Sequence, residues 1–211
     1  MSFPKKTLLG SLLLLSATSA FAVDTADLRV IGTIAPTACT PTFAGGGTIN
    51  YGLIPGASLS ATAETALAVR TISYTITCNA PIRIGMSWTD SRRDSTVRAP
   101  YNGLGKHMGA NIGFFLMTPV PAGTTADGAS VDLISRTNDT AAWVLASAIS
   151  PIVPDGVRTH SYAPKGTLVP GAYSNYAGTI NVLSVIAPTS TLDMTRSVTL
   201  DGLTTMIVRY L

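Results

Sequence analysis

The feature that most constrains the fold is the run Thr71–Cys78, in which polar and apolar side chains alternate without interruption. Ile72, Tyr74 and Ile76 fall on one side of this run, and threonine and serine residues fall on the other. A period of two fits a half-buried β-strand and does not fit a helix. Similar short runs recur along the chain, separated by Gly, Pro, Asn and Asp. The sequence therefore predicts an all-β fold, and the spacing favours a sandwich over an α/β fold.

The segments predicted as strands share this alternating or apolar character. They are Leu28–Ile34, Thr48–Tyr51, Thr71–Cys78, Ile82–Thr89, Ile112–Thr118, Val131–Ser135, Ala142–Ala146, Thr179–Ile186 and Thr204–Leu211. The Ala-rich segment Ser58–Val69 is predicted to form a helical turn. No long amphipathic helix and no internal repeat is visible.

The first 22 residues have the features of a secretory signal peptide. Lys5 and Lys6 give a positive start, Leu8–Leu15 gives a short apolar centre, and Ala20-Phe21-Ala22 gives a small-residue cleavage site. We therefore expect residues 1–22 to be removed and residues 23–211 to form one β-sandwich domain. No segment is long and apolar enough to predict a transmembrane span. An exported, soluble chain is expected.

Charge argues against one class of partner. Without Lys5 and Lys6 the chain has 12 basic and 11 acidic residues, so it is close to neutral. A nucleic-acid-binding protein would be expected to carry clustered Lys and Arg. The sequence predicts no nucleic-acid partner.

Catalytic and cofactor motifs are not apparent. The two histidines, His107 and His160, lie outside any recognisable nucleophile or metal motif. Asp90 and Asp94 are close in sequence, but the arginines between them would keep both carboxylates ionised, which does not suit acid catalysis. We expect a protein that is not an enzyme and that needs no metal or cofactor.

Cys39 and Cys78 are the only cysteines, and both lie in the part expected to be exported. Neither occurs in a Cys-x-x-Cys motif, so a redox or metal role has little support. One intramolecular disulfide is predicted, because exported proteins fold in an oxidising compartment. Closing a loop of this length should contribute about 4 kcal/mol by the chain-entropy estimate.

The last residues form another alternating strand. Met206, Val208 and Tyr210 point to one face, and Ile207, Arg209 and Leu211 point to the other. The segment lacks the proline and multiple lysines that often protect a sheet edge. It is therefore a candidate for pairing with another chain, whereas pairing within the protein's own sheet is the simpler alternative.

Two further features each have two interpretations. Trp88 and Trp143 could be platforms for a sugar, but their apolar surroundings are more typical of core residues. The charged segment Asp90–Arg98, together with Lys106 and His107, could contact a receptor or subunit. A solvated loop between two strands is the simpler interpretation.

Several segments together resemble the subunits of chaperone–usher pili. The resemblance comprises Gly32–Cys39, Thr48–Gly52, Ile72–Cys78, Pro170–Tyr173 and Met206–Leu211, in that order. Both ends of the chain fit well, and residues 90–165 fit poorly. The nearest resemblance within this superfamily is to exported fimbria-like proteins.

This resemblance implies an immunoglobulin-like (pilin-type) β-sandwich that can lack its final strand, with one disulfide. A periplasmic chaperone, acting with an usher, would fill the gap with its own strand, and a neighbouring fimbrial subunit would later replace it. Met206, Val208 and Tyr210 would pack against the incoming strand, and the Leu211 carboxylate would bind chaperone cations. The family pattern places Leu28, Val30, Gly32 and Ile34 in the first strand.

One departure from the family changes the expected role. If Leu28 and Val30 belong to the first strand, the remaining extension is short and carries Asp24 and Asp27. A buried aspartate is costly, so the chain would be a poor strand donor. We therefore expect a minor or terminating fimbrial subunit in the periplasm or on the surface of a Gram-negative-type envelope.

Two alternatives remain open. Residues 165–200 could complete the sandwich internally, and then no partner strand would be needed. An exported carbohydrate-binding or adhesive module, with a surface glycan or receptor as partner, is the alternative function.

Overall fold

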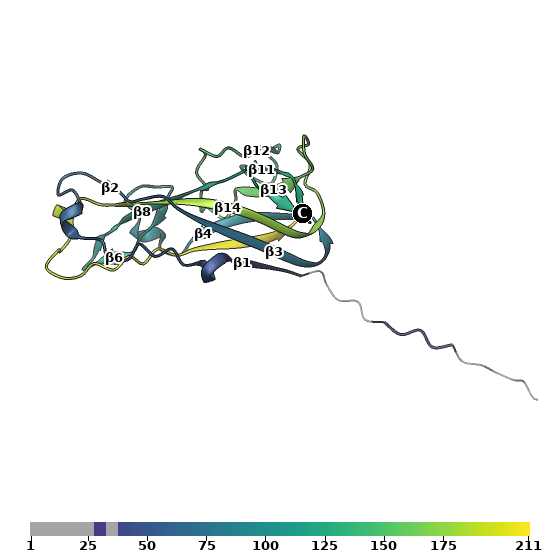
Figure 1. Cartoon of the computed structure of the whole chain (residues 1–211), viewed down its shortest axis with the longest axis horizontal. Helices are drawn as coiled ribbons and strands as arrows, with labels where there is room; N and C mark the ends of the chain where they lie inside the picture. The colour runs from purple at the N-terminus through teal and green to yellow at the C-terminus, as the bar shows by residue number, and fades with distance from the viewer. Residues whose placement is uncertain (1–27, 33–37) are drawn as a thin grey trace, which may run out of the picture. The chain divides into compact units, whose positions relative to one another are not determined.

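A computed structural model describes residues 28–32 and 38–211, and these residues contain β-strands and short 3₁₀ helices but no α-helix. Figure 1 shows the arrangement. The strands are β1 Cys39–Phe43, β2 Thr65–Ala66, β3 Arg70–Ile82, β4 Ile84–Asp90, β5 Asn102–Gly103, β6 Lys106–His107, β7 Ala110–Asn111, β8 Gly113–Pro119, β9 Thr125–Ala126, β10 Ala129–Ser130, β11 Asp132–Arg136, β12 Val144–Leu145, β13 Thr159–Ala163, β14 Tyr173–Ile186 and β15 Thr204–Tyr210. The 3₁₀ helices are η1 Ala44–Gly47, η2 Gly56–Ser58, η3 Arg93–Ser95 and η4 Thr189–Thr191.

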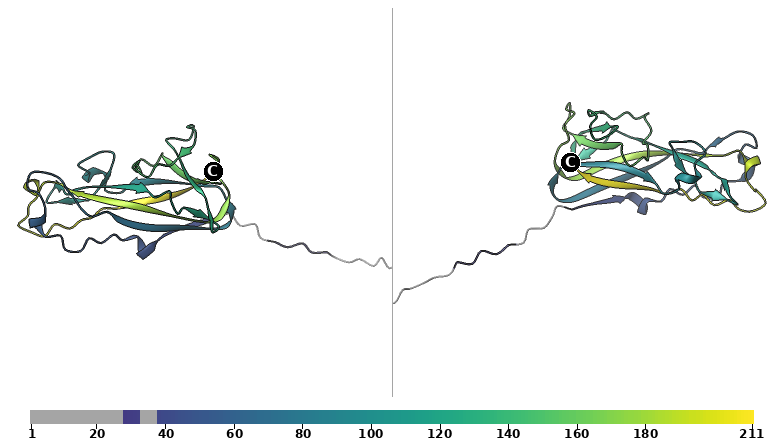
Figure 2. Two further views of the ribbon diagram at one scale, coloured as in Figure 1. Left: turned by 45° about the horizontal axis from the view of Figure 1, so that its top comes forward. Right: turned by 180° about the vertical axis from the view of Figure 1, so that it is seen from behind.

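The strands form two main antiparallel sheets. The larger sheet has the order β1-β3-β14-β8-β5, with β2, β9 and β10 joined to it at its margins. The smaller sheet has the order β12-β11-β13-β4-β15, and β6 and β7 make a separate two-stranded pair. Figure 2 shows β14 and β15 from two further directions. The protein is therefore all-β and sandwich-like, as the sequence predicts.

The core lies between these sheets and uses the predicted faces. Tyr74 and Ile76 of β3 are buried, and Ile72 packs against the core from a partly buried position. From the other sheet, Met86 and Trp88 of β4 join the same cluster of buried side chains. The predicted alternation of Thr71–Cys78 is confirmed, because one face of β3 covers the core.

Several other strand predictions are confirmed with shifted bounds. The predictions Ile82–Thr89, Ile112–Thr118, Val131–Ser135, Thr179–Ile186 and Thr204–Leu211 correspond to β4, β8, β11, β14 and β15. Ala142–Ala146 contains only the two-residue strand β12. The helical turn predicted for Ser58–Val69 is wrong, since this segment holds the end of η2 and then the short strand β2.

Besides several two-residue strands, the five-residue strands β1 and β13 escaped prediction because their side chains do not alternate in polarity. On β13, His160 and Tyr162 line the core, while Thr159 and Ser161 are buried on the other face. The Ser161 hydroxyl donates a 2.6 Å hydrogen bond to the carbonyl of Ile84. On β1, a polar Cys-Thr-Pro-Thr sequence pairs with β3 through its backbone.

The prediction of a first strand over Leu28–Ile34 is wrong for the described part of that segment. Residues 28–32 have no strand structure, and Leu28, Val30 and Ile31 are 91%, 88% and 80% exposed. Gly32 has no atom within 4 Å of the position a Cβ would take, and Ile34 lies outside the described residues. An alternating pattern requires an apolar surface to pack on, and residues 28–32 do not bury their apolar side chains. The strand that pairs with β3 is β1, which begins at Cys39.

The predicted disulfide between Cys39 and Cys78 is present. It joins β1 to β3 at a pair of residues that lie opposite each other in the ladder. The backbone N–H of Cys39 also donates a 3.1 Å hydrogen bond to the hydroxyl of Tyr210 on β15. This end of β1 is therefore tied to both main sheets.

We expect the variant C39A/C78A to be less stable than the wild-type protein by about 2–5 kcal/mol, because the disulfide restricts the unfolded chain. Urea unfolding of the variant and of the oxidised wild-type protein measures this difference. Reduced wild-type protein is the control and should match the variant. Equal stability of all three samples would contradict a stapling role.

His160 is a titratable side chain held in the core. Its Nδ1 atom is buried without a hydrogen-bond partner among the described residues. The ring lies in a small space lined by apolar and aromatic side chains, among them Tyr74, Met86 and Trp88. Burial disfavours the charged imidazolium and lowers the pKa of His160 to about 4.

This lowered pKa predicts a specific acid sensitivity. The unfolded chain, with a histidine pKa near its ordinary value of 6.5, binds a proton that the folded protein excludes between these two values. The free energy of unfolding should therefore fall by roughly 3 kcal/mol between pH 7 and pH 4. Urea unfolding across this range measures the slope, and H160Q should lack most of it. An unchanged slope in H160Q would assign the acid sensitivity to other groups.

Candidate functional site

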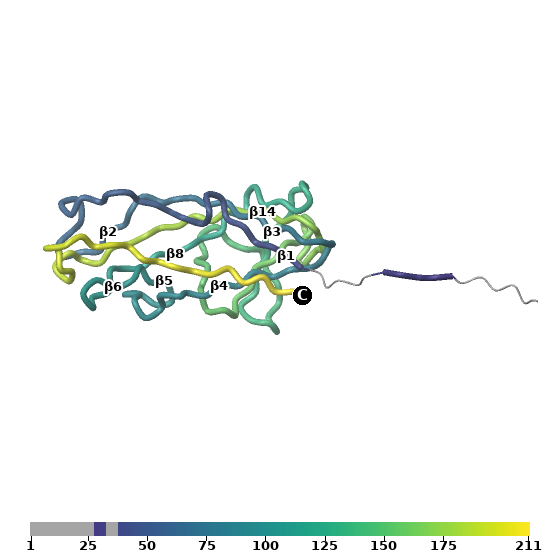
Figure 3. The backbone as a smooth tube through the Cα atoms, turned by 90° about the horizontal axis from the view of Figure 1, so that it is seen from below, coloured from purple at the N-terminus to yellow at the C-terminus, as the bar shows by residue number. Residues whose placement is uncertain are grey.

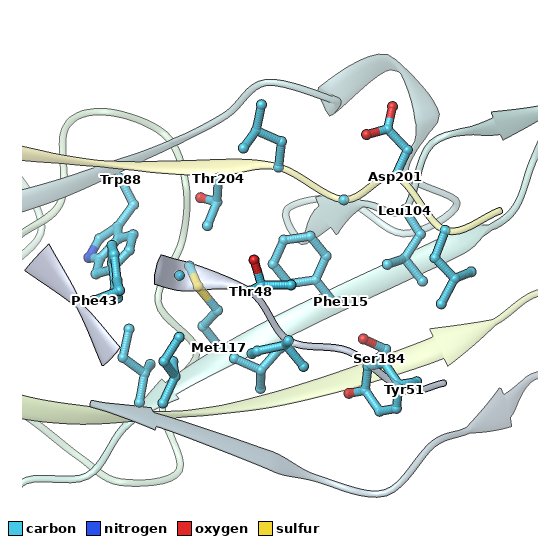
Figure 4. A pocket seen from close by; sticks show the side chains of 18 of the residues that line it. Phe43, Thr48, Tyr51, Trp88, Leu104, Phe115, Met117, Ser184, Asp201 and Thr204 are labelled. Atoms are coloured by element: carbon cyan, nitrogen blue, oxygen red, sulfur yellow. The ribbon is translucent and has the colours of Figure 1, made fainter. Parts of the chain in front are cut away.

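The two main sheets leave an opening along one side of the core. A pocket of about 560 Å³ opens there, and its walls include core residues of both sheets. Figure 4 shows Trp88, Phe43 and Met117 toward one end of it, and Leu104, Tyr51 and Ser184 toward the other. The complete lining is Phe43, Gly46, Gly47, Thr48, Ile49, Tyr51, Ile72, Trp88, Leu104, Phe115, Met117, Ile180, Val182, Ser184, Leu200, Asp201, Gly202, Leu203 and Thr204. The pocket therefore reaches the core, although Trp88, Phe115 and Met117 in its inner wall are only 2%, 7% and 2% exposed.

A second pocket continues the opening. It has a volume of about 660 Å³ and shares Ile49, Tyr51 and Leu200 with the first pocket. We call the two pockets together the groove. One side of the groove is formed by Thr48–Ile54, which we call the flap, and the other by Val198–Thr204, which we call the anchored lip. Figure 3 shows the chain regions that contain these two segments passing along the same side of the domain.

The anchored lip is held by several polar contacts. Arg92 makes a two-pronged ion pair with Asp201, with Nε–Oδ2 and Nη2–Oδ1 distances of 2.7 and 3.1 Å. The Asp201 N–H donates to the carbonyl of Leu104, and the Ser91 N–H donates to the carbonyl of Leu203, both at 2.9 Å. The hydrogen bond from Arg92 lowers the pKa of Asp201. This lip is fixed in position at its end next to β15.

The flap has almost no backbone hydrogen bonds. In the described chain its backbone makes one local hydrogen bond, in which the Gly52 N–H donates to the Asn50 side-chain oxygen at 2.7 Å. Ile49 and Tyr51 are nevertheless partly buried at the groove, and Ile49 packs against the core. The strand predicted for Thr48–Tyr51 is therefore wrong, although the inward side chains alternate as in a strand. The missing element is a neighbour to which the backbone could bond.

The predicted partner-contact residues lie beside the groove and not in it. None of Met206, Val208, Tyr210 and Leu211 lines either pocket. Met206 is buried in the core, and Val208 packs against the core from a partly buried position. Tyr210 is 52% exposed and accepts the hydrogen bond from Cys39, while Leu211 is 43% exposed. That Met206, Val208 and Tyr210 pack against an incoming strand, and that Leu211 binds chaperone cations, stays a prediction.

The position of β1 explains why these four residues lie outside the groove. Its first residue is tied to β3 by the disulfide and to Tyr210 by a hydrogen bond, so this end of the opening is occupied. The groove begins where β15 begins, at Thr204, and follows the chain toward Met194. β15 is still an edge strand, since β4 is the only strand that pairs with it in the described structure.

Sequence reasoning missed most of the groove. Leu200, Leu203 and Ile49 lie in segments without regular structure, where a pattern of strand positions gives little information. The alternation of Val198 and Leu200 was a usable signal, because both pack against the core. Phe115 and Met117 belong to a correctly predicted strand, but their position in the wall of a groove depends on the absence of a neighbour that no local pattern reveals.

The tryptophans have different environments. Trp88 is 2% exposed and belongs to the core, so its interpretation as a sugar platform is not supported. Trp143 is partly buried, and the Arg136 guanidinium lies 4.7 Å from its ring centre. Arg136 also bonds to Asp139, at 2.7 Å. One face of Trp143 is therefore already used within the protein.

The charged segment Asp90–Arg98 is an ordered loop with internal partners. Asp90 accepts hydrogen bonds from the backbone N–H groups of Arg92 and Gly103, both at 2.8 Å. Lys106 pairs with Asp94 at 2.8 Å, and this contact lowers the pKa of Asp94. The loop therefore supports the anchored lip through Arg92, a role that the two sequence interpretations did not include.

The histidines and acidic residues of the described chain do not gather in one place. His107 Nε2 lies 3.1 Å from the carbonyl oxygen of Asp193. His160 lies in the core, beside a different pocket. Within residues 28–32 and 38–211, no group of three or more His, Cys, Asp or Glu side chains could hold a metal ion. The helices of this described part are all too short or too polar to cross a membrane.

Sequence comparisons add relatives for part of the chain. Residues 28–114 match the family described as "Protein of unknown function (DUF1120)". Protein GltF of Escherichia coli (strain K12) is 35% identical over 88 residues, which is 39% of this chain and 35% of GltF. Uncharacterized protein YhcF of the same strain is 37% identical over 79 residues, which is 37% of this chain and 33% of YhcF. The chain matches about a third of the length of these relatives.

The ion pair at the lip gives a testable prediction. Replacement of Arg92 by alanine should speed amide hydrogen exchange at Ser91 and Asp201, because the lip loses its side-chain contact while its backbone bonds remain. D201N should give a similar change, and the double variant should add little to either single one. R93A is the matched control, since Arg93 is exposed and makes no ion pair in the described structure. Equal exchange in all variants would show that the lip is held by its backbone alone.

Proposed function

We propose that this protein is an exported fimbrial or fimbria-like structural subunit that accepts a β-strand from another polypeptide. Its fold would be an immunoglobulin-like, pilin-type sandwich with one strand missing. The observation that carries the proposal is the groove, which lies over core side chains of both sheets and between two segments that lack strand partners. A strand inserted there would pack on the partly buried Ile49, Ile72 and Leu200 and would bond to free backbone groups.

The physical gain has two parts. Apolar side chains of the incoming strand would remove the exposed groove surface from water, which is favourable in proportion to the area covered. Backbone groups of Val198, Thr199 and Leu200, which have no backbone partners in the described structure, would gain hydrogen bonds. Side-chain pockets on one face of the strand would fix its register. Together these effects favour an extended partner over a compact ligand.

A suitable strand is present in this chain itself. In an extended conformation Leu28, Val30, Gly32 and Ile34 would share one face, and Arg29, Ile31 and Thr33 would share the other. The described residues of this segment are exposed and are not part of β1. Leu28–Ile34 and Val198–Thr204 are both seven residues long, so the two segments match in length. We propose that this segment of one copy occupies the groove of a second copy.

This donor changes the role proposed from the sequence. The expectation of a minor or terminating subunit depended on Leu28 and Val30 being part of the first strand, and they are not. A chain with both a groove and a free apolar segment can act as acceptor and donor. Within the same proposal, a periplasmic chaperone and usher would supply the strand before assembly, as the resemblance to pili implies. The disulfide is consistent with folding in the periplasm.

A synthetic peptide of residues 25–36 tests the proposal. We expect the peptide to bind the purified chain beginning at residue 38 with one-to-one stoichiometry in titration calorimetry. The peptide variant with Val30→Asp should bind at least about tenfold more weakly, because a charge would enter the apolar groove.

Variants of the acceptor provide the controls. L200D should weaken binding of the unmodified peptide, while L168D should not, because Leu168 is 45% exposed and lies outside both pockets. Near-ultraviolet circular dichroism checks that each variant is folded. Binding that is equal for the Val30→Asp peptide, or no binding of the unmodified peptide, would contradict this donor. If only a chaperone strand binds, the groove accepts a strand but the proposed donor of residues 28–34 is contradicted.

A further inference from the structure

The two sides of the groove differ in how they are held. The anchored lip has the Arg92–Asp201 ion pair and backbone bonds to neighbouring segments. The flap has one internal hydrogen bond and touches the rest of the domain through side chains such as Ile49. The Arg70 guanidinium, 5.6 Å from the ring centre of Tyr51, is a further side-chain contact. A segment held in this way can move without breaking a sheet ladder.

A hinge lies directly before the flap. Gly45, Gly46 and Gly47 have φ angles of 60°, 69° and 79°, which is the left-handed region. Only glycine adopts this region routinely, and three successive residues there are unusual for any other sequence. A Cβ at Gly45 or Gly46 would meet no atom within 4 Å, so packing does not require a small residue at either position. The requirement is conformational.

From these observations we infer that the flap Thr48–Ile54 is a hinged cover of the groove. It rotates about Gly45–Gly47, lies against the core when the groove is empty, and moves to admit a strand. With the strand in place, the flap becomes its hydrogen-bonded neighbour, which accounts for the strand-like alternation of Ile49 and Tyr51. The role in admitting a strand rests on the proposed function, whereas the motion itself can be tested without a partner.

Ser184 offers a reporter under the flap. It is 3% exposed, lies on β14, and lines the same pocket as Tyr51, as Figure 4 shows. Ser87 is its matched control, because it is fully buried on β4 and lines neither groove pocket. The natural cysteines are joined to each other, so an introduced cysteine would be the only free thiol of the described chain.

The experiment measures maleimide labelling of S184C and S87C under native conditions, with and without hinge substitutions. G45A/G46A should speed labelling of S184C by about tenfold, because alanine is disfavoured in the left-handed conformation of the closed flap. Labelling of S87C should be unchanged. G123A is the matched glycine control, since Gly123 also has a positive φ and nothing within 4 Å, and it should affect neither reporter.

Two outcomes would overturn the hinge. One is unchanged labelling of S184C in G45A/G46A, which would mean that the glycines do not control access. The other is an equal increase for S184C and S87C, which would mean global destabilisation; the single variant G46A applies the same comparison with a smaller perturbation. Addition of the peptide of residues 25–36 should slow S184C labelling. If the glycine substitutions speed S184C labelling and the peptide has no effect on it, the flap motion is supported and the proposed donor segment is contradicted.

Discussion

The structure depends on a core that its own sheets do not fully enclose. Trp88 of the smaller sheet and Phe115 and Met117 of the larger sheet pack in one cluster, and they form the inner wall of a pocket in which each is at most 7% exposed. Ile49, Ile72 and Leu200 around this wall are only partly buried, and covering them further would be favourable. The disulfide and the Tyr210–Cys39 hydrogen bond close one end of the seam between the sheets. The remaining length is the groove, and the proposed strand exchange follows from it.

The surroundings of the groove show how such an opening can coexist with a folded domain. Arg92 and Asp201 hold one lip, and the ordered loop Asp90–Arg98 supports that contact. The flap on the other side lies against the core through Ile49, without the backbone bonds that would fix it. With the flap motion that we infer, this asymmetry would provide a rigid edge for pairing and a movable cover over the core. Stability and partner binding would then use the same apolar surface.

The sequence predicted the parts of the fold in which local pattern and tertiary burial agree. Thr71–Cys78 alternates and lies with one face on the core, so periodicity was sufficient to identify β3. On β13 the same test failed, because Thr159 and Ser161 are buried on the face opposite the core. For Leu28–Ile34 the pattern was present, but its described residues 28–32 form no strand and leave their apolar side chains exposed. Periodicity shows that a segment could pack as a strand, and it does not say against which chain.

The sequence predicted the kind of site, an exposed sheet edge, but not its location. Alternation in Thr204–Leu211 correctly indicated an exposed sheet edge, and β15 is the edge of its sheet. The location of the opening depended on where β1 ends and on how Val198–Thr204 crosses the core, which are long-range features. A crystal structure of the protein with the peptide of residues 25–36 is the most direct test. The account predicts an extended strand between Tyr51 and Leu200, bonded to the anchored lip. An empty groove, or one filled by residues of the same molecule, would contradict it.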